Sequence, residues 1–285
     1  MIWVWNTDLE LVGGILAVAM LYRMALRLGR ARFAPDSPFP LRSVLLMDTA
    51  LVVFYLAVGS PLDEAGDHFL FFAHMIQHSV LIFLLPPLML AAMPSWMFLP
   101  LAENPTARAI FSFLVSPLVA LSSFTVIFTL WHLPVLYEFA LRDRQVHNVE
   151  HSMFVLTALQ AWWPVVSQSE EFPRLRPGPR MLYLFLATLS QIPLFGFLTM
   201  SRVPYYPTYI EAPRILPITP LQDQIIGGIL MKFLGEIVFG GYLLLAFAEW
   251  YHERQEEGSD VAPVARAVAT LDAHDSEGDA SSGAD

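Results

Sequence analysis

The chain alternates long apolar stretches with short polar connections. Seven apolar stretches run for roughly 18 to 25 residues with few charges, and this is the length that an α-helix needs to cross the core of a bilayer. The pattern predicts an all-α, polytopic membrane protein with seven transmembrane helices. The predicted spans cover residues 9–26, 41–58, 68–93, 109–131, 146–166, 181–200 and 225–250.

The composition is typical of this class of protein. Of the 285 residues, 55% are hydrophobic and only 15% are charged, which is more apolar than a soluble domain of this length. Cysteine is absent, so disulfides and thiolate metal sites are excluded, and a soft metal would need His or Met ligands. The sequence contains no recognisable phosphate-binding loop, nucleophilic triad or basic nucleic-acid surface. We therefore expect the lipid bilayer, and no nucleic acid, as its environment.

Acidic charge is concentrated at the C-terminal end of the chain. The net charge of −10 comes mostly from residues 252–285, which are rich in Asp, Ser, Ala and Gly and poor in large hydrophobic side chains. Such a segment cannot bury enough apolar surface to fold. We predict a seven-helix transmembrane domain over residues 1–251 and an acidic, disordered cytoplasmic tail over residues 252–285.

The arginines predict the orientation of the spans, because Lys232 is the only lysine. If the spans alternate in direction, eleven arginines fall on one side of the membrane and four on the other. Positively charged connections stay in the cytoplasm. The N-terminus is therefore predicted to lie outside and the C-terminus inside. The eleven arginines are Arg23, Arg27, Arg30, Arg32, Arg42, Arg108, Arg174, Arg176, Arg180, Arg254 and Arg266.

Six of the eight histidines gather in the outer layer under this orientation. His74 and His78 in the third predicted span are four residues apart, and so are His147 and His151 in the fifth. One helical turn separates the members of each pair, so their imidazoles point to one side and can share a metal ion. Ionisable side chains inside a span are rare and usually functional. The candidate metal ligands are His74, His78, His147 and His151, with His68 and His132 as entry or alternate ligands.

A packing role is the alternative interpretation of these histidines. A single histidine in a span more often bonds a backbone carbonyl or a neighbouring helix than a metal. Two pairs at similar depth on the same side are difficult to explain by packing alone, so we favour a metal site. Glu150, next to His151, has two open interpretations. It could orient an imidazole through the free ring nitrogen, or it could be a solvated acid at the membrane interface.

Two further features concern the helices themselves. Lys232 and Glu236 are four residues apart within the last predicted span, where an unpaired charge is costly, so we expect them to pair. Pro86 and Pro87 each lack a backbone donor, and we expect them to kink the third span below its histidines.

Several short motifs occur together in an order that resembles a known family. They resemble the membrane-integral cytochrome c oxidase assembly factors of the CtaG type, and the resemblance covers residues 3–250. The motifs are His74-Met75-Ile76-Gln77-His78 followed by Pro86-Pro87, Trp131-His132-Leu133-Pro134-Val135-Leu136-Tyr137, His147-Asn148-Val149-Glu150-His151 followed by Trp163-Pro164, and Tyr206-Pro207 leading to Asp223-Gln224 and Gly227.

The resemblance implies a multi-pass protein of the plasma membrane with seven spans. It implies a non-enzymatic function in the maturation of haem–copper oxidase, with oxidase subunits as partners and copper as the metal that is bound or delivered. The single-span copper chaperones that share the family's name carry cysteines, and the lack of cysteine here agrees with the distinction.

Two other classes of protein remain open on the residues alone. His147, Glu150 and His151 match the H-x-x-E-H string of zinc peptidases, and the histidine pairs are similar to the boxes of membrane desaturases. An integral-membrane metalloenzyme is therefore one alternative. A haem protein in which one histidine from each of two helices binds the iron is the other.

Overall fold

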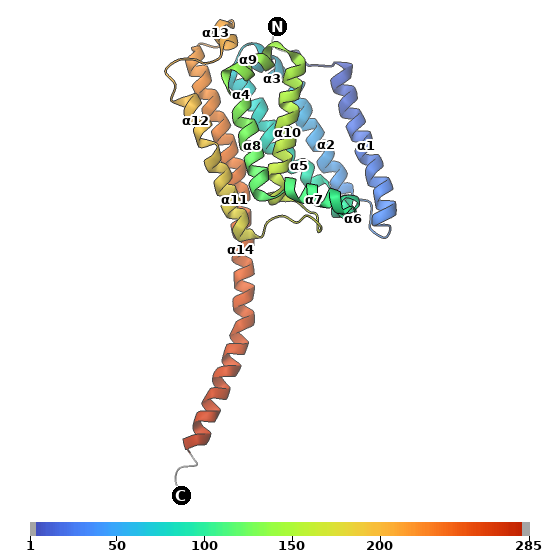
Figure 1. Ribbon diagram of the computed structural model, residues 1–285, viewed down its shortest axis with the longest axis vertical. Helices are drawn as coiled ribbons and strands as arrows, with labels where there is room; N and C mark the ends of the chain where they lie inside the picture. Colours follow the sequence, from blue (N-terminus) through green and yellow to red (C-terminus); the bar gives the residue numbers. More distant parts are fainter. Residues whose placement is uncertain (1–3, 281–285) are drawn as a thin grey trace.

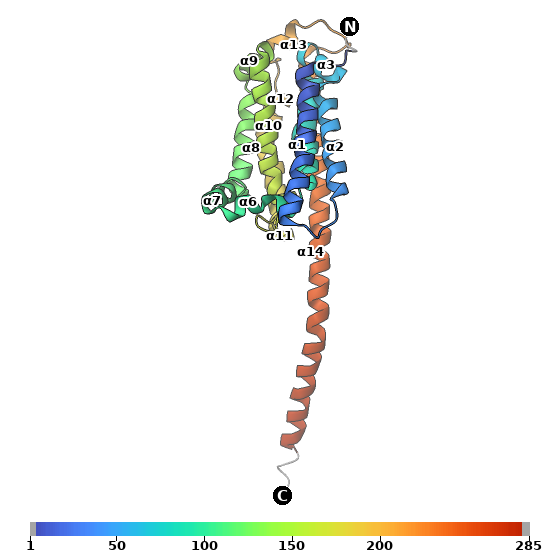
Figure 2. The same cartoon turned by 90° about the vertical axis from the view of Figure 1, so that its right-hand side faces the viewer.

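The computed structural model describes the backbone of residues 4–280 and the side chains of residues 4–256. Within this range the regular secondary structure is helical throughout. The long helices stand side by side in one bundle, as Figures 1 and 2 show from two directions. The short helices α3, α9 and α13 lie at the end of the bundle near the N-terminus, whereas α6 and α7 lie at the opposite end (Figure 1).

The helices follow one another along the chain with short connections. They are α1 (Leu9–Phe33), α2 (Leu41–Val58), α3 (Pro61–His68), α4 (Phe71–Ser79), a π-helical turn (Val80–Leu84), α5 (Leu85–Ala92), a 3-10 turn (Ser95–Phe98), α6 (Leu99–Glu103), α7 (Pro105–Leu114), α8 (Pro117–Trp131), α9 (Pro134–Arg142), α10 (Arg144–Val166), α11 (Pro177–Ser190), α12 (Ile192–Thr199), α13 (Pro207–Glu211) and α14 (Pro220–Ala280).

Among the described residues, five helical segments are long and apolar enough to cross a membrane. They are α1, α2, the continuous segment 71–92, the segment 177–199 and the first part of α14. A sixth arises if α7 and α8 form one span, but these two helices meet at an angle of 59°. The predicted span over residues 109–131 is therefore not a single helix but falls on two helices that meet at a bend. Pro117 is the physical reason, because a proline keeps the preceding residue, Ser116, out of the helical conformation.

The remaining predicted span, residues 146–166, coincides with α10. This helix is 23 residues long, but it is more polar than the others because His147, Asn148, Glu150 and His151 occupy its first two turns. It packs against α8, α5 and α9 within the bundle. It is not among the helices that are apolar enough to count as spans, so only its length matches a transmembrane span.

The helical segment that carries His74 and His78 changes its winding just below them. Residues 80–84 form a π-helical turn, and Pro86 follows directly in α5. Pro86 has no N–H to donate to the carbonyl of Ile82, four residues earlier. The indole Nε1 of Trp162 on α10 donates to that carbonyl instead, at 2.8 Å. The predicted disturbance at the prolines thus takes the form of a π-helical turn that ties α10 to this segment.

Helix α14 packs along α4 and holds its first turn in place. The carboxylate of Asp223, which is fully buried, accepts hydrogen bonds from the backbone N–H groups of Phe71 and Phe72 at 3.0 and 2.9 Å. Gly227, one turn further on, allows the close approach, because a Cβ there would lie 2.5 Å from the Phe71 ring. The beginning of α4 is therefore stabilised from a helix that lies about 150 residues later in the sequence.

The predicted pair on the last span is confirmed. Lys232 and Glu236 form an ion pair one turn apart on α14. The ammonium of Lys232 also donates to the backbone carbonyl of Thr188 on α11, at 2.9 Å. These contacts satisfy the two charges and join α14 to α11, so they have a packing role.

The backbone of the C-terminal segment differs from the sequence-based expectation. We predicted disorder for residues 252–285; α14 continues as a helix from this boundary through Ala280, and residues 281–285 lie outside the described part of the chain. This part of α14 leaves the bundle and projects away from it (Figures 1 and 2). An α-helix satisfies its own backbone hydrogen bonds and needs no partner for them, and alanine and glutamate, frequent in this segment, favour the helical conformation.

Candidate metal centre

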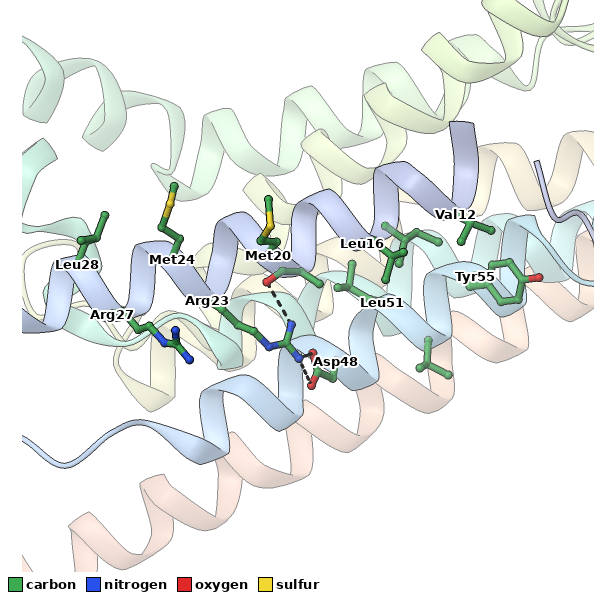
Figure 3. A pocket seen from close by; sticks show the side chains of 13 residues that line it. Val12, Leu16, Met20, Arg23, Met24, Arg27, Leu28, Asp48, Leu51 and Tyr55 are labelled. Carbon is green, nitrogen blue, oxygen red and sulfur yellow. Dashed lines mark hydrogen bonds and ion pairs between the residues drawn. The ribbon is translucent and has the colours of Figure 1, made fainter. Parts of the chain in front are cut away.

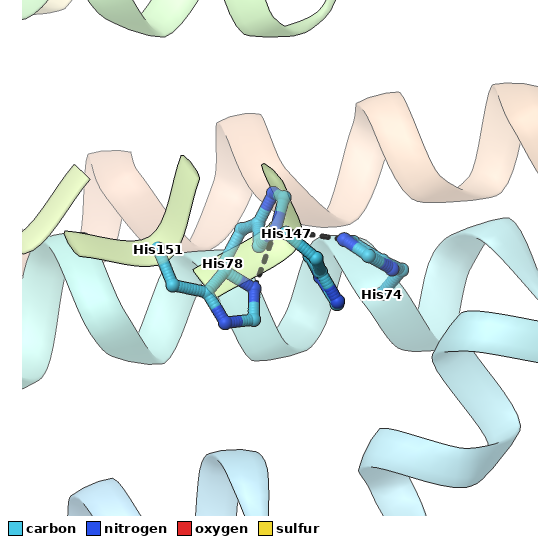
Figure 4. A group of neighbouring side chains, drawn as sticks. All are labelled: His74, His78, His147 and His151. Atoms are coloured by element: carbon cyan, nitrogen blue, oxygen red, sulfur yellow. Dashed lines mark hydrogen bonds between the residues drawn. The ribbon is translucent and has the colours of Figure 1, made fainter. Parts of the chain in front are cut away.

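Four histidines from two helices converge on one another (Figure 4). His74 and His78 project from α4, and His147 and His151 project from α10. One ring nitrogen of each lies within 4.8 Å of those of the other three. Nε2 of His78 lies 2.7 Å from Nε2 of His74 and 3.2 Å from Nε2 of His151. The structure thus brings together both pairs that the sequence singled out.

The histidine group is enclosed by protein. His74 and His78 are completely buried, and His147 is 9% exposed. The rings pack against one another and against Phe154, whose centroid lies 4.9 Å from that of His78. A single ion bound by imidazole nitrogens at ~2.0–2.1 Å suits this spacing. A porphyrin would need a flat space between two of the rings, and the contacts between them leave little room for such a plane.

Asp67 on α3 contacts one histidine of each pair. Its Oδ1 lies 3.4 Å from Nδ1 of His74, and its Oδ2 lies 3.6 Å from Nδ1 of His147. A carboxylate favours a proton on the nitrogen that faces it, so the lone pairs of these two rings are directed to Nε2. Nε2 is the nitrogen that faces the centre of the group in His74. The position of Asp67 therefore leaves Nε2 of His74 and of His147 available to a metal ion.

The charge of Asp67 also favours a cation. Burial alone would raise the pKa of this carboxyl, but the His74 imidazole, together with His147 and His151, lowers the pKa overall. The group is therefore an anion at neutral pH, beside histidine rings that can supply neutral ligands. Sequence reasoning assigned Asp67 no contact with the histidines. No local spacing predicts this contact, because the extended backbone of Leu70 breaks the helix between Asp67 and His74.

A glycine makes the approach of α3 to α4 possible. A Cβ on Gly66 would lie 3.0 Å from both the Cα and the backbone N of His74. Backbone atoms cannot move aside as a flexible side chain can. Any larger residue at position 66 would therefore push α3, and with it Asp67, away from His74.

His132 lies beside the group but is not one of the four. It is completely buried, its ring centroid is 5.9 Å from that of His78, and its Nδ1 lies 2.6 Å from the carbonyl oxygen of Phe128. A carbonyl can only accept, so Nδ1 carries the proton and Nε2 has the lone pair. That Nε2 has no hydrogen-bond partner among the described residues. Its chemistry therefore fits an alternate ligand.

His68 lies outside the group. Its side chain is 62% exposed, and its Nδ1 is 3.9 Å from the Glu64 carboxylate on the same helix, α3. The helical segment containing His74 begins only at Phe71, because Leu70 has an extended backbone conformation. This break separates His68 from the helix that carries His74 and His78.

Three buried tyrosines close the group on the side of α9 and α13. Tyr206 donates to the backbone carbonyl of His132 at 2.8 Å, and Tyr209 donates to that of Gly66 at 2.7 Å. The hydroxyls of Tyr137 and Tyr209 are 3.0 Å apart. Tyr137 and Tyr206 come from the motifs that carry the family resemblance, and the hydrogen bonds of the three tyrosines hold the chain on both sides of the histidines.

Glu150 is buried beside the group. It is 1% exposed, and its Oε1 has no hydrogen-bond partner among the described residues. The interpretation as a solvated interfacial acid is therefore wrong, because the fold covers this position. The carboxylate that contacts imidazoles is that of Asp67, on a different helix.

The fold and the site together define a helical membrane protein with a buried four-histidine centre that is suited to a metal ion. The model of the cytochrome c oxidase caa3 assembly factor family matches residues 20–253, a range that includes all four histidines, Asp67 and His132. The chain belongs to this family. No curated protein matches the chain, and no solved structure matches it either.

Proposed function

We propose that this protein supports the assembly of cytochrome c oxidase by binding copper between α4 and α10 and delivering it to oxidase subunits. The observation that supports this proposal is the convergence of four histidine nitrogens within 4.8 Å. Membership of the assembly-factor family supplies the biological context. Copper fits both the histidine ligands and the family's context of oxidase assembly. Imidazole binds copper well, and copper forms the most stable complexes among the divalent first-row metals.

Each residue of the site has a distinct part in the proposed function. The four imidazoles of His74, His78, His147 and His151 hold the ion, and copper supplies no reaction here because it is the cargo. Asp67 keeps the lone pairs directed inward. The free Nε2 of His132 offers the next ligand on the side of α8. His68, exposed on α3, serves as an entry ligand at the surface.

We further propose seven spans, an outer N-terminus and a location in the plasma membrane. In this arrangement α10 and the bent pair α7–α8 each count as one span. Arginines in the last turn of α1, in α7 and in the connection before α11 belong to the end of the bundle from which α14 leaves (Figure 1). The histidines lie toward the other end, so the positive-inside rule puts copper binding at the outer face.

Metal analysis of purified variants tests the proposed site. The purified protein should contain copper, and His78→Ala and His151→Ala should each abolish it, because each removes an imidazole from the centre of the group. His68→Ala is the matched control, since its side chain is exposed and outside the group. It should keep bound copper and change only the rate of loading.

Oxidase activity in cells that depend on each variant completes the experiment. We expect activity to fall with His78→Ala and His151→Ala while the amount of protein in the membrane stays unchanged. Full copper and full activity in both variants would show that the histidines only pack. Zinc or haem in the purified protein in place of copper would favour the metalloenzyme or the haem alternative.

A further inference from the structure

A long apolar groove lies between α1 and α2 (Figure 3). Its volume is about 920 Å³, and ligand pockets commonly measure ~300–1,000 Å³. Apolar side chains from both helices line it, among them Leu16, Met20, Leu51 and Val52. None of the lining residues belongs to α4 or α10, which carry the histidine group. The groove is therefore a separate feature of the molecule.

The groove exists because α1 packs loosely. Of its 25 residues, only Tyr22 and Leu26 are buried. Tyr22 donates to the backbone carbonyl of Ala92 at 2.7 Å, and this contact holds the helix near α5. The face of α1 that carries Leu16 and Met20 is left to line the groove, and both side chains are exposed.

Two arginines of α1 line the groove, and they differ in their partners. Arg23 is satisfied within the protein, since its Nη2 lies 2.6 Å from both carboxylate oxygens of Asp48 and its Nη1 donates to the carbonyl of Ala19. Arg27, one turn further on, is exposed and has no ion-pair or hydrogen-bond partner among the described residues. A charge at this depth without an anion is unusual in a membrane protein. The guanidinium of Arg27 is therefore available to bind an anion in the groove.

The depth of Arg27 identifies the kind of anion. It precedes Phe33, the last residue of α1, by six residues, or about 9 Å along the helix axis. From this depth the long side chain of an arginine reaches the level of the lipid head groups. Arg30 in the last turn of α1 and Arg42 in the first turn of α2 add positive charge at this end of the two helices. Basic pockets between membrane helices at such a position bind anionic lipid head groups.

We propose that the groove between α1 and α2 binds an anionic phospholipid. The phosphate lies against Arg27, and the acyl chains extend along Met20, Leu16, Leu51 and Val52 toward the middle of the bilayer. A single lipid molecule has both an anionic head group, which can reach Arg27, and long acyl chains, which can pack along the apolar side chains of the groove. A helix from another protein would need an acidic side chain at the depth of Arg27 to pair with it. The lining offers such a helix no second charged contact, because Asp48 already neutralises Arg23.

Native mass spectrometry of the full-length protein in detergent tests this proposal. Phosphatidylglycerol and phosphatidylcholine serve as the probes, because they share acyl chains and differ in charge. The wild-type protein should bind one phosphatidylglycerol about tenfold more tightly than phosphatidylcholine, which is the range of a hydrogen bond to a charged group. Arg27→Gln should remove this preference.

Two variants separate the proposed contacts from general effects of charge. Arg32→Gln is the matched control: it removes the same charge from the same helix, but Arg32 lies over the Phe33 ring and does not line the groove. It should bind phosphatidylglycerol as the wild type does. Ala19→Trp fills the groove and should weaken binding of both lipids.

Three results would overturn the proposal. The first is equal binding of the two lipids by the wild type, and the second is an equal loss of binding in Arg27→Gln and Arg32→Gln. The third is a second copy of the chain, or another membrane polypeptide, that remains bound to the wild type and is displaced by Ala19→Trp. That last result would assign the groove to a protein partner. None of these measurements depends on copper, so the test is independent of the proposed function.

Discussion

Asp67 connects the two histidine pairs of the candidate metal centre. It is the one described carboxylate within 4 Å of histidines from both α4 and α10. Its position depends on Gly66, whose lack of a side chain lets α3 lie against the backbone of His74. One small residue and one charged residue thus determine how two of the four imidazoles are directed.

The substitution Asp67→Asn tests the orienting role of this carboxylate. Asparagine keeps the size of the side chain but removes the charge that favours a proton on Nδ1 of His74 and His147. Loss of a residue that orients a ligand reduces metal affinity by about 10- to 100-fold. We expect a loss of this size for copper, measured by competition with a chelator of known affinity.

Glu64→Gln provides the control for the change in charge. Glu64 lies on the same helix, is more exposed than Asp67, and contacts the exposed His68 instead of the histidine group. It should leave copper affinity within about twofold of the wild type. Equal losses in the two variants would assign the effect of Asp67 to the general charge of α3 and not to its contacts with the imidazoles.

At the scale of the helices, the beginning of α4 depends on α14. The extended conformation of Leu70 leaves the first backbone N–H groups of α4 without partners inside the helix. The buried carboxylate of Asp223 accepts two of them. His74 follows Phe71 by less than one turn. The position of its imidazole therefore depends on Asp223, in the first turn of the last helix.

Replacement of Asp223 should therefore destabilise the protein and the metal centre together. Asp223→Ala leaves the buried N–H of Phe71 and the partly buried N–H of Phe72 without an acceptor, and a buried donor without a partner costs about 1–3 kcal/mol. We expect the free energy of unfolding to fall by about 2–4 kcal/mol and copper affinity to fall with it. The measurement is reversible denaturation in detergent, with and without copper.

Asp223→Asn refines this test because asparagine keeps one acceptor oxygen. It should fall between the wild type and Asp223→Ala in both stability and affinity. A loss of stability without any change in copper affinity would show that α4 finds the same position without its cap.

At the scale of the whole molecule, the function proposed here depends on which end of the bundle faces outward. The charged pairs at the two ends differ. Arg108 pairs with Glu171, and Arg180 pairs with Glu249 at the point where α14 leaves the bundle. The other end carries α3 with Asp63, Glu64 and Asp67, of which Asp67 contacts two of the four histidines. The pKa of Asp63 is raised to about 7, mainly because the carboxyl is buried and to a smaller extent because the negative charge of Asp67 is close.

Reporter fusions test this orientation. A phosphatase that is active only outside the cytoplasm should be active after Arg202, in the connection between α12 and α13, and inactive after Arg174, in the connection that precedes α11. A fluorescent protein that matures only in the cytoplasm should give the opposite result at the same two positions. The reverse pattern would put the histidines inside and contradict copper delivery at the outer face.

The sequence by itself determined the class of protein and the candidate ligands. Apolar length and helical spacing are local properties, so stretches such as residues 41–58 coincide with α2, and the pairs at i, i+4 in α4 and α10 each lie on one helical face. The pairing of Lys232 with Glu236 was predictable for the same reason. The break at Pro117 also had a local cause, although the length of the apolar stretch concealed it.

Only the tertiary structure decided which residues meet around those ligands. His74 and His147 are 73 residues apart, and Asp67 contacts both only because α3 folds back over α4 at Gly66. The same folding separates His68 from the group and brings His132 beside it. The groove between α1 and α2 arises in the same way. Such contacts depend on how each helix is rotated about its axis and on which helices become neighbours, and local periodicity contains neither kind of information.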